Sequence, residues 1–301
     1  MSSEAYCRIA DLVLRVVFDF VFPAQNSYMQ EFLVEPCEPD YTLTFCQTDN
    51  IPSFLEQYPV FVGEIAKFHY YQDPEGMDAC FHIHDGYYHA VTILGADSGI
   101  CHYLSVEWLK EEIERGNHLE NFFCIEKLLM RFDAMILHSC HIQKDGQAIL
   151  FTAPSGTGKS TQGDLWQMHR GAEIINGDRT IIRKRNGIWH AYGAPFCGTS
   201  NIHLNRQAPI KAIVVLRQAP EDHAERIYGH PAFTAIYSEL TVNSWNDAFV
   251  RKTLNWVTEL SDEIKIYRFL CTKTPGAVDT LEKVLYESPA LESVQTRESG
   301  I

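Results

Sequence analysis

Residues 153–160, with the sequence APSGTGKS, have the composition and spacing of a loop that binds phosphate. Glycines at 156 and 158 allow a tight turn in which backbone N–H groups face inward. Lys159 would reach the terminal phosphates of a nucleotide, and Ser160 would give its hydroxyl to Mg²⁺. The common pattern G-x-x-x-x-G-K-[ST] begins with glycine, whereas this chain has Ala153. The loop tolerates this change if that position needs only a small side chain.

The segments on either side of the loop are those that a phosphate-binding loop requires. Residues 147–153 (QAILFTA) form a short apolar run typical of a buried strand, and residues 158–171 form a helical pattern that ends at a glycine. The start of that helix would add the positive end of its dipole. A Gly/Ser-rich linker would need neither feature. We therefore predict ATP binding by Ser155, Gly156, Thr157, Gly158, Lys159, Ser160 and Thr161.

One acidic residue follows the next predicted strand. The segment EIINGDRT places Asp178 after an apolar run, 19 residues beyond Lys159. A carboxylate in this place would hold Mg²⁺ or its waters, so Ser160 and Asp178 are the predicted metal ligands. The alternative is that Asp178 is a turn residue or a helix cap.

These motifs resemble those of a known family. The chain is similar to the catalytic domain of HPr kinase/phosphorylase, a bacterial protein-serine kinase whose fold is related to that of phosphoenolpyruvate carboxykinase. It looks closer still to HPr-kinase-related proteins found beside peptide-modifying enzymes. The resemblance covers roughly residues 138–217. It rests on His138, which lies 15 residues before Ala153, on PSGTGKS, on Arg170-Gly171, and on Gly177-Asp178 where the family has two acids.

The resemblance implies transfer of the γ-phosphoryl group of ATP to a hydroxyl, that of a serine or threonine in a peptide or small protein. Lys159 and Asp178 would be catalytic, with Asp178 receiving the hydroxyl proton. His138 would accept a proton or contact a phosphate, unless it is a structural histidine. Two departures stand out: Gly177 replaces one acid, and Thr161 replaces a glutamate. The signature segment of the phosphorylase reaction is not recognisable after Asp178, although by position residues 191–216 are a candidate substrate loop.

Two other functions stay open. The first is a kinase that acts on a metabolite or free amino acid, or less plausibly a carboxykinase. The second is an ATP-binding regulator with weak catalysis, which the glycine at 177 favours. Phosphate release without acceptor phosphorylation would support the regulator.

The order of patterns predicts an α/β fold, with an HPr-kinase/carboxykinase-like phosphate-loop domain preceded by a β-rich N-terminal α+β domain. The expected divisions are residues 1–120, a β-rich domain of unknown role; residues 121–290, the kinase-like domain; and residues 291–301, a flexible tail. Helices are expected over residues 105–116 and 119–137. Asn186-Gly187 predicts a hairpin with a type I′ turn.

Composition limits the partners. The 301 residues include 25 basic and 39 acidic side chains, giving a net charge of −14, which repels a nucleic-acid backbone. The apolar run near the N-terminus is broken by charged residues, so we expect neither a signal peptide nor a membrane span. Nine cysteines without a CxxC pair favour reduced thiols in the cytoplasm. The expected partners are ATP and a peptide or small-protein acceptor, with a homo-oligomer as a further option.

Overall fold

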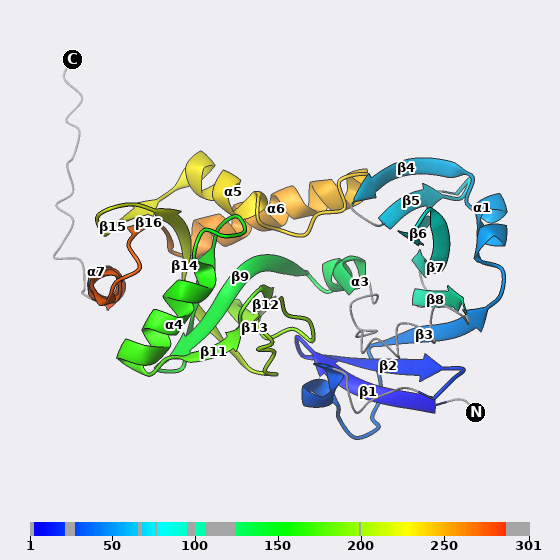
Figure 1. Ribbon diagram of the computed structural model, residues 1–301, viewed down its shortest axis with the longest axis horizontal. Helices are drawn as coiled ribbons and strands as arrows, with labels where there is room; N and C mark the ends of the chain where they lie inside the picture. Colours follow the sequence, from blue (N-terminus) through cyan, green and yellow to red (C-terminus); the bar gives the residue numbers. More distant parts are fainter. Residues whose placement is uncertain are drawn as a thin grey trace, which may run out of the picture.

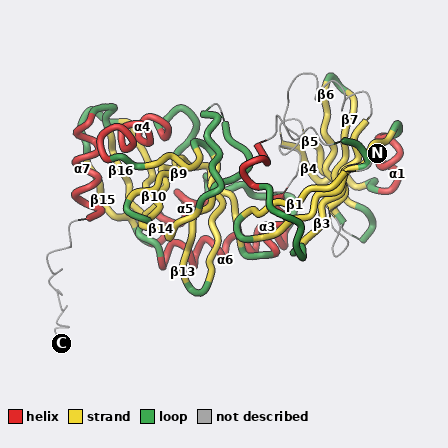
Figure 2. The backbone as a smooth tube through the Cα atoms, turned by 90° about the horizontal axis from the view of Figure 1, so that it is seen from below, coloured by secondary structure: helices red, strands yellow, loops and turns green. Residues whose placement is uncertain are grey.

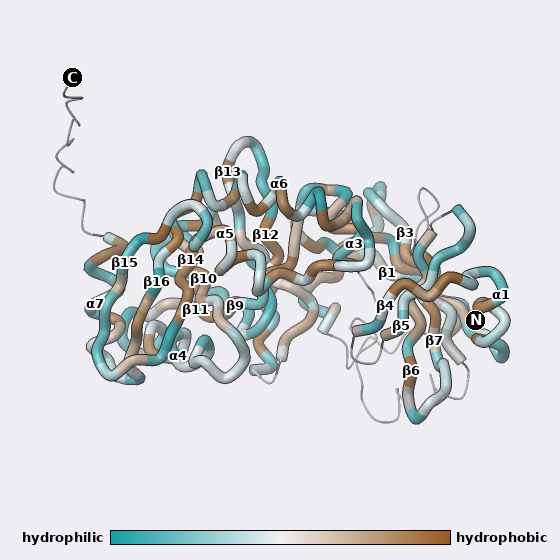
Figure 3. The backbone as a smooth tube through the Cα atoms, turned by 90° about the horizontal axis from the view of Figure 1, so that it is seen from above, coloured by the Kyte–Doolittle hydropathy of each residue, from teal (hydrophilic) through white to brown (hydrophobic). Residues whose placement is uncertain are grey.

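The computed structural model describes residues 3–21, 28–65, 68–75, 77–94, 100–105, 125–198 and 200–286. In this part of the chain two large sheets lie one after the other along the long axis of the molecule (Figures 1 and 2). Hydrophobic residues concentrate along strands such as β9, β10 and β14 (Figure 3). The helix expected over residues 105–116 and the tail lie outside the described residues.

The first sheet is formed by eight strands from residues 3–105. Its order is β1-β2-β3-β8-β7-β6-β5-β4, and the pairs β2–β3 and β3–β8 are parallel whereas the others are antiparallel. The strands are β1 (Ser3–Ile9), β2 (Leu12–Phe18), β3 (Tyr41–Thr48), β4 (Val60–Ile65), β5 (Phe68–Gln72), β6 (Asp78–His84), β7 (Tyr87–Leu94) and β8 (Ile100–Ser105). The short helices are η2 (Tyr28–Phe32), η3 (Ile51–Ser53) and α1 (Phe54–Gln57).

The second sheet follows the order β10-β9-β12-β13-β14-β16-β15, with β11 paired to β9 and β10 also paired to β14. Its strands are β9 (Ala134–Lys144), β10 (Gln147–Thr152), β11 (Glu173–Asn176), β12 (Arg179–Arg185), β13 (Ile188–Tyr192), β14 (Gln207–Gln218), β15 (His223–Ile227) and β16 (Ile266–Cys271). The helices are α3 (Ile125–Arg131), α4 (Lys159–Arg170), α5 (Gly229–Tyr237), α6 (Asp247–Glu263) and α7 (Pro275–Tyr286). The architecture is therefore mixed α/β.

Strands β9 and β14 are long, and each pairs with three other strands. Residues 134–138 of β9 pair with β12, and residues 139–144 pair with β10. The start of β14 pairs with β13, and its later residues pair in parallel with β10 and β16. Because β10, β14 and β16 are parallel, their carboxyl ends meet at one edge, where α/β folds bind ligands.

Alternation along β10 explains how helices cover both faces of this sheet. Ile149 and Phe151 belong to one core cluster with Trp166 of α4 and residues of α7. Leu150 faces the other way and packs in a cluster with residues of α5 and α6, including Trp256. Successive side chains of a strand point to opposite faces. A strand in which every residue is apolar is therefore buried on both faces. Figure 1 shows α4 and the pair α5 and α6 on opposite sides of these strands.

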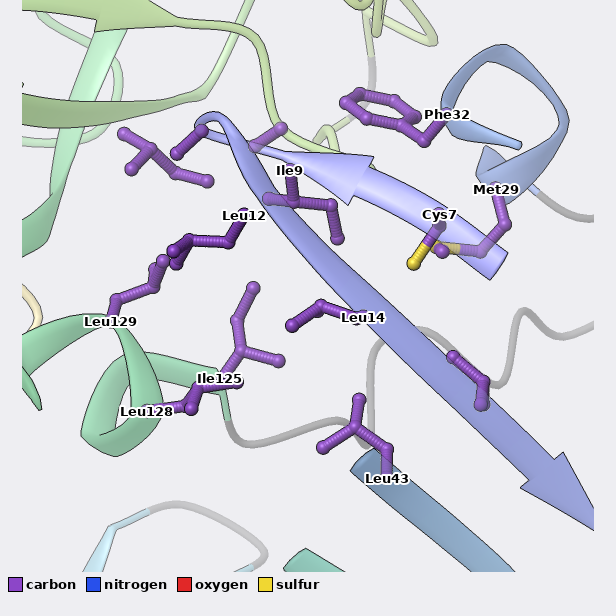
Figure 4. Close-up of a cluster of buried hydrophobic side chains, with 14 of the residues drawn as sticks. Cys7, Ile9, Leu12, Leu14, Met29, Phe32, Leu43, Ile125, Leu128 and Leu129 are labelled. Carbon is purple, nitrogen blue, oxygen red and sulfur yellow. The ribbon is translucent and has the colours of Figure 1, made fainter. Parts of the chain in front are cut away.

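The N-terminal hairpin joins the core of the second sheet. Leu12 and Leu14 of β2 pack with Ile125, Leu128 and Leu129 of α3 (Figure 4), and the same cluster includes residues of β9, β12 and β13. At the tip of the hairpin, the Ala10 carbonyl accepts a hydrogen bond from Arg183 Nη1 at 2.7 Å, and Asp11 Oδ2 accepts one from Tyr192 at 2.7 Å.

A charged contact joins the first sheet to α3 and the segment before α6. Asp78 of β6 is fully buried and pairs with Lys127 of α3. It also accepts hydrogen bonds from Gln72 at 2.7 Å and from Asn246 at 3.0 Å. A buried carboxylate needs such partners because it has lost its hydration.

Two local predictions have different outcomes. The Asn186-Gly187 turn between β12 and β13 is confirmed, with φ of 51° and 79°, as a type I′ turn requires. The helix expected over residues 119–137 is wrong at its C-terminal end, because α3 stops at Arg131 and β9 begins at Ala134. Asp133 takes a φ of 56°, which ends the helix, and the apolar run that follows suits a buried strand as well as a helix.

Candidate functional site

The predicted phosphate loop lies between a strand and a helix at the carboxyl edge of the second sheet. Strand β10 ends at Thr152 and helix α4 begins at Lys159. Gly156 and Gly158 have φ of 79° and 115°, a region that residues with a Cβ atom rarely adopt. The first backbone N–H groups of a helix have no partner within the helix, so the start of α4 offers donors to an anion. Ser160 is exposed at this helix start.

The structure explains why alanine is accepted at the first position of the loop. Ala153 is fully buried and packs in the cluster of Phe151 and Trp166. Its φ is not among the positive values of the chain, so its backbone does not require glycine. A small apolar side chain is therefore compatible with the conformation of the loop.

Lys159 lies over the loop with its ammonium group on backbone carbonyls. Its Nζ donates to the carbonyl oxygen of Ala153 at 2.7 Å, and the side chain is buried. Burial lowers the pKa of this ammonium, while the nearby carboxylates of Glu239 and Asp178 act in the opposite direction. The only cationic side chain of the loop thus lies within electrostatic range of two acids.

Glutamine side chains fix the loop and its helix to the ends of the parallel strands. Gln218, the last residue of β14, donates to the carbonyl oxygens of Gly156 at 3.3 Å and Thr157 at 3.2 Å. Gln162 of α4 donates to the carbonyl of Thr272 just after β16 at 2.9 Å. These bonds connect the loop to β14, which lies beside β10, and the helix to the end of β16, the next parallel strand.

Asp178 lies at the turn between β11 and β12, and Asn176 holds this turn. The Asn176 carbonyl oxygen Oδ1 accepts from the backbone N–H of Asp178 at 2.9 Å and of Arg179 at 2.8 Å. Its amide Nδ2 donates to the carbonyls of Ala194 and Phe196 at 3.2 and 3.0 Å. Asn176 is fully buried, so one side chain positions both the acid and the segment after β13.

A histidine lies between two carboxylates beside the loop. His138 Nε2 is 3.2 Å from Asp178 Oδ1, and His138 Nδ1 is 3.3 Å from Glu239 Oε2. Arg179 Nε donates to the other oxygen of Asp178 at 3.1 Å. The hydrogen bond with His138 lowers the pKa of Asp178 against the effect of partial burial, and Arg179 lowers it further. Only the imidazolium form of His138 can donate to both acids at once.

Glu239 is the member of this cluster that sequence reasoning missed. It lies just beyond α5, 101 residues after His138, and its side chain is only 10% exposed. Its carbonyl accepts from the backbone N–H of His138 at 2.9 Å, and the next residue forms a bridge with Leu137. No spacing or motif in the sequence signals this contact, because it arises from the pairing of distant segments.

Gly177 is crowded by the segment after β13. A Cβ atom at this position would lie 2.3 Å from Ser200 Oγ and 2.5 Å from Ser200 Cβ, closer than such atoms approach. A Cβ at Gly198 would lie 3.0 Å from Asp178 Cγ. The residue that replaces the acid expected at 177 is therefore one that the position of Ser200 requires.

The structure brings His138, Asp178 and Lys159 near one another, whereas Ser160 and Thr161 lie at the start of α4. For Mg²⁺, the available donors would be the Ser160 hydroxyl, the Asp178 carboxylate and phosphate oxygens, a set of hard oxygen ligands that suits this ion. Within the described residues no group of three or more His, Cys, Asp and Glu side chains has the arrangement of a metal site. Mg²⁺ at phosphates commonly uses only one or two protein ligands.

Comparisons with known proteins give little. No family model matches the sequence, and no curated protein matches it. Among solved structures, the HPr(Ser) kinase/phosphatase from Coxiella burnetii matches with a TM-score of 0.29 and 12% identity, over 50% of this chain and 94% of that chain. At this score the similarity carries no argument, so the function must be argued from the site. Among the described residues, no helix has both the length and the apolar character needed to cross a bilayer.

Proposed function

We propose that the chain is an ATP-dependent phosphotransferase of the serine/threonine kinase type. It would move the γ-phosphoryl group of ATP·Mg²⁺ to a hydroxyl of a peptide or small protein. The observation that carries this proposal is the cluster of His138, Asp178 and Glu239 beside the lysine of a glycine loop. Phosphoryl transfer needs positioned phosphates, neutralised charge and a group that orients the nucleophile, and this site offers all three.

ATP would bind with its phosphates at residues 155–161. Lys159 would exchange the carbonyl of Ala153 for phosphate oxygens, which compensate its charge better than a neutral carbonyl. Ser160 and Asp178 would hold Mg²⁺, the first by its hydroxyl and the second by its carboxylate. The bound ion would neutralise charge that develops on the transferred group.

The two carboxylates of the cluster would have different roles, Asp178 at the metal and the acceptor and Glu239 behind His138. The acceptor hydroxyl oxygen would attack the γ-phosphorus, the bond to the β–γ bridging oxygen would break, and ADP would leave. Asp178 would receive the hydroxyl proton, while Glu239 compensates the charge of His138 from the far side of the ring. In this arrangement His138 is a positioning residue that orients Asp178 toward the acceptor.

The first experiment is a thermal-shift panel with Mg²⁺ and ATP, ADP, GTP, pyrophosphate or oxaloacetate. We expect ATP·Mg²⁺ to raise the melting temperature of the parent chain and of the control Lys265→Ala, whose exposed side chain lies far along the sequence from the loop. Lys159→Ala should keep its fold and lose the shift. A shift that persists in Lys159→Ala contradicts the assignment of the loop.

Transfer is then measured with radiolabelled γ-phosphate and a peptide library that contains serine and threonine. Label on a peptide supports the kinase, and label on free amino acids or metabolites instead supports a small-molecule kinase. The second candidate function is an ATP-binding regulator with weak catalysis. This candidate is favoured by Gly177 and by the hydrogen bond from Arg179 to Asp178. Phosphate release without a labelled acceptor would support it.

A further inference from the structure

The N-terminal part of the chain carries a marked charge imbalance. Residues 16–66 contain eight Asp or Glu residues and no Lys or Arg. Three of these acids are exposed near β1: Glu31 in η2, and Glu35 and Glu38 between η2 and β3. A surface of one sign attracts partners of the opposite sign and repels copies of itself. The chemistry of this face therefore suits a basic partner.

A groove opens on this face beside the edge strand β1. Its cavity of about 660 Å³ is lined by residues 3–6 of β1, by Val21 and by residues 33–36. Val21 is 70% exposed and Leu33 is 41% exposed, so the groove offers apolar side chains to solvent. Glu35 adds an exposed carboxylate to the lining, whereas the carboxylate of Glu4 pairs with Arg15 at 2.7 Å. Figure 4 shows Cys7, Met29 and Phe32 packed together near this edge.

The groove exists because a short ladder beside β1 stops. Val34 N–H donates to the Tyr6 carbonyl at 2.9 Å, and Cys7 forms an antiparallel bridge with Leu33. Pro36, two residues further along, has no N–H and cannot extend this ladder toward the start of β1. The segment and the strand therefore separate, and the space between them is the groove.

The backbone of β1 at the groove is oriented for pairing with another strand. The Tyr6 carbonyl points away from β2, toward Val34. Residues two apart in a strand direct their backbone groups to the same side, so the N–H and carbonyl of Glu4 also point away from β2. An extended chain in the groove would find both a hydrogen-bonding edge and apolar contacts, as in strand addition.

A continuous set of contacts leads from this groove to the candidate site. The Arg8 carbonyl, further along β1, accepts from Asn205 Nδ2 at 3.4 Å, and Tyr28 of η2 packs on His203 with ring centroids 4.4 Å apart. His203 forms a bridge with Asn176, the residue that holds the turn of Asp178.

We propose that the groove beside β1 binds an extended, basic segment of a partner peptide. Binding of such a segment follows from the edge, the apolar lining and the acidic face. That the bound peptide is also the phosphoryl acceptor rests on the proposed function.

The test uses the full chain without nucleotide and a fluorescein-labelled 12-residue peptide of alternating lysine and valine. Fluorescence anisotropy should show binding that weakens as salt rises, whereas a peptide of alternating glutamate and valine should not bind. Glu35→Lys should weaken binding at least tenfold. The control Glu75→Lys, an equal charge change at an exposed turn far from the groove, should stay within twofold. Equal losses of binding affinity in both variants would show that the peptide is attracted by overall charge, and would overturn the proposal that it binds in the groove.

A second pair of variants separates edge pairing from charge. Glu4→Pro removes the outward N–H and blocks strand addition, whereas Glu4→Ala removes only the side chain. We expect a large loss of binding in the first and a small loss in the second. Equal binding by both overturns the strand-addition geometry. If sedimentation shows that the chain pairs with itself through this edge, and Glu4→Pro abolishes the pairing, the occupant is a second copy and the proposal is wrong.

Because these measurements contain no ATP, they fail or succeed independently of phosphotransfer. If the peptide binds as predicted and no acceptor is phosphorylated, the groove stands and the kinase proposal falls. If an acceptor is phosphorylated but the peptide does not bind, only the proposal about the groove is wrong.

Discussion

The glycine at 177 provides a direct test of the packing at the candidate site. Gly177→Ala places a Cβ atom 2.3 Å from Ser200 Oγ and 2.5 Å from Ser200 Cβ. Its φ is not positive, so the backbone accepts alanine and the cost is steric. Overpacking of this kind costs about 1–3 kcal/mol. We expect the free energy of unfolding, measured by urea denaturation, to fall by that amount with an unchanged dependence on denaturant.

A double-mutant cycle isolates the contact. Ser200→Gly removes both of the crowding atoms and should cost only about 0.5–1 kcal/mol, from added backbone freedom. In that background Gly177→Ala should cost almost nothing, so the two changes should couple by about 1–3 kcal/mol. The control is Gly276→Ala in α7, where a Cβ atom meets nothing closer than 3.6 Å and stability should be kept or raised. Additive effects of the pair would refute the account of why an acid is absent at 177.

Two further predictions concern charge. Burial lowers the pKa of His141 to about 3, against about 6.5 in the unfolded chain, so stability is full above pH 6.5 and is lost as pH falls toward 3. Between pH 6.5 and 5 the parent chain should therefore lose about 2 kcal/mol of unfolding free energy that His141→Leu does not lose. Denaturant titration at several pH values measures this, and an equal pH dependence in parent and variant would contradict it. Glu239→Gln should bind ATP as tightly as the parent or more tightly, since a negative charge near Lys159 is gone, while transfer falls tenfold or more. Calorimetry and labelled-phosphate transfer would check both, and a parallel loss of binding and transfer would remove Glu239 from its proposed role.

The sequence predicted those parts of the site that depend on local pattern. The loop of residues 153–158 lies between β10 and α4 because its neighbours carry the periodicities of a strand and a helix. His138 and Asp178, both predicted as site residues, lie next to each other. Their roles in catalysis stay predictions.

The parts that the sequence did not predict depend on contacts between distant segments. Glu239 reaches His138 through a turn that follows α5, and nothing near residue 239 indicates its partner. Gly177 looked like the loss of a functional acid, but its environment shows a steric requirement set by Ser200. Likewise, the parallel neighbours of β3 in the first sheet depend on long connections that no periodicity reveals.

Strand β9 has a consequence for how the molecule unfolds. Its first half pairs with β12, beside the N-terminal hairpin, and its second half pairs with β10, which leads into the loop. His138 lies where one pairing gives way to the other. Loss of either half would release the backbone of this one strand and, with it, the orientation of the ring. The nucleotide side and the hairpin side of the second sheet thus share one strand, so local opening at His138 would disturb both.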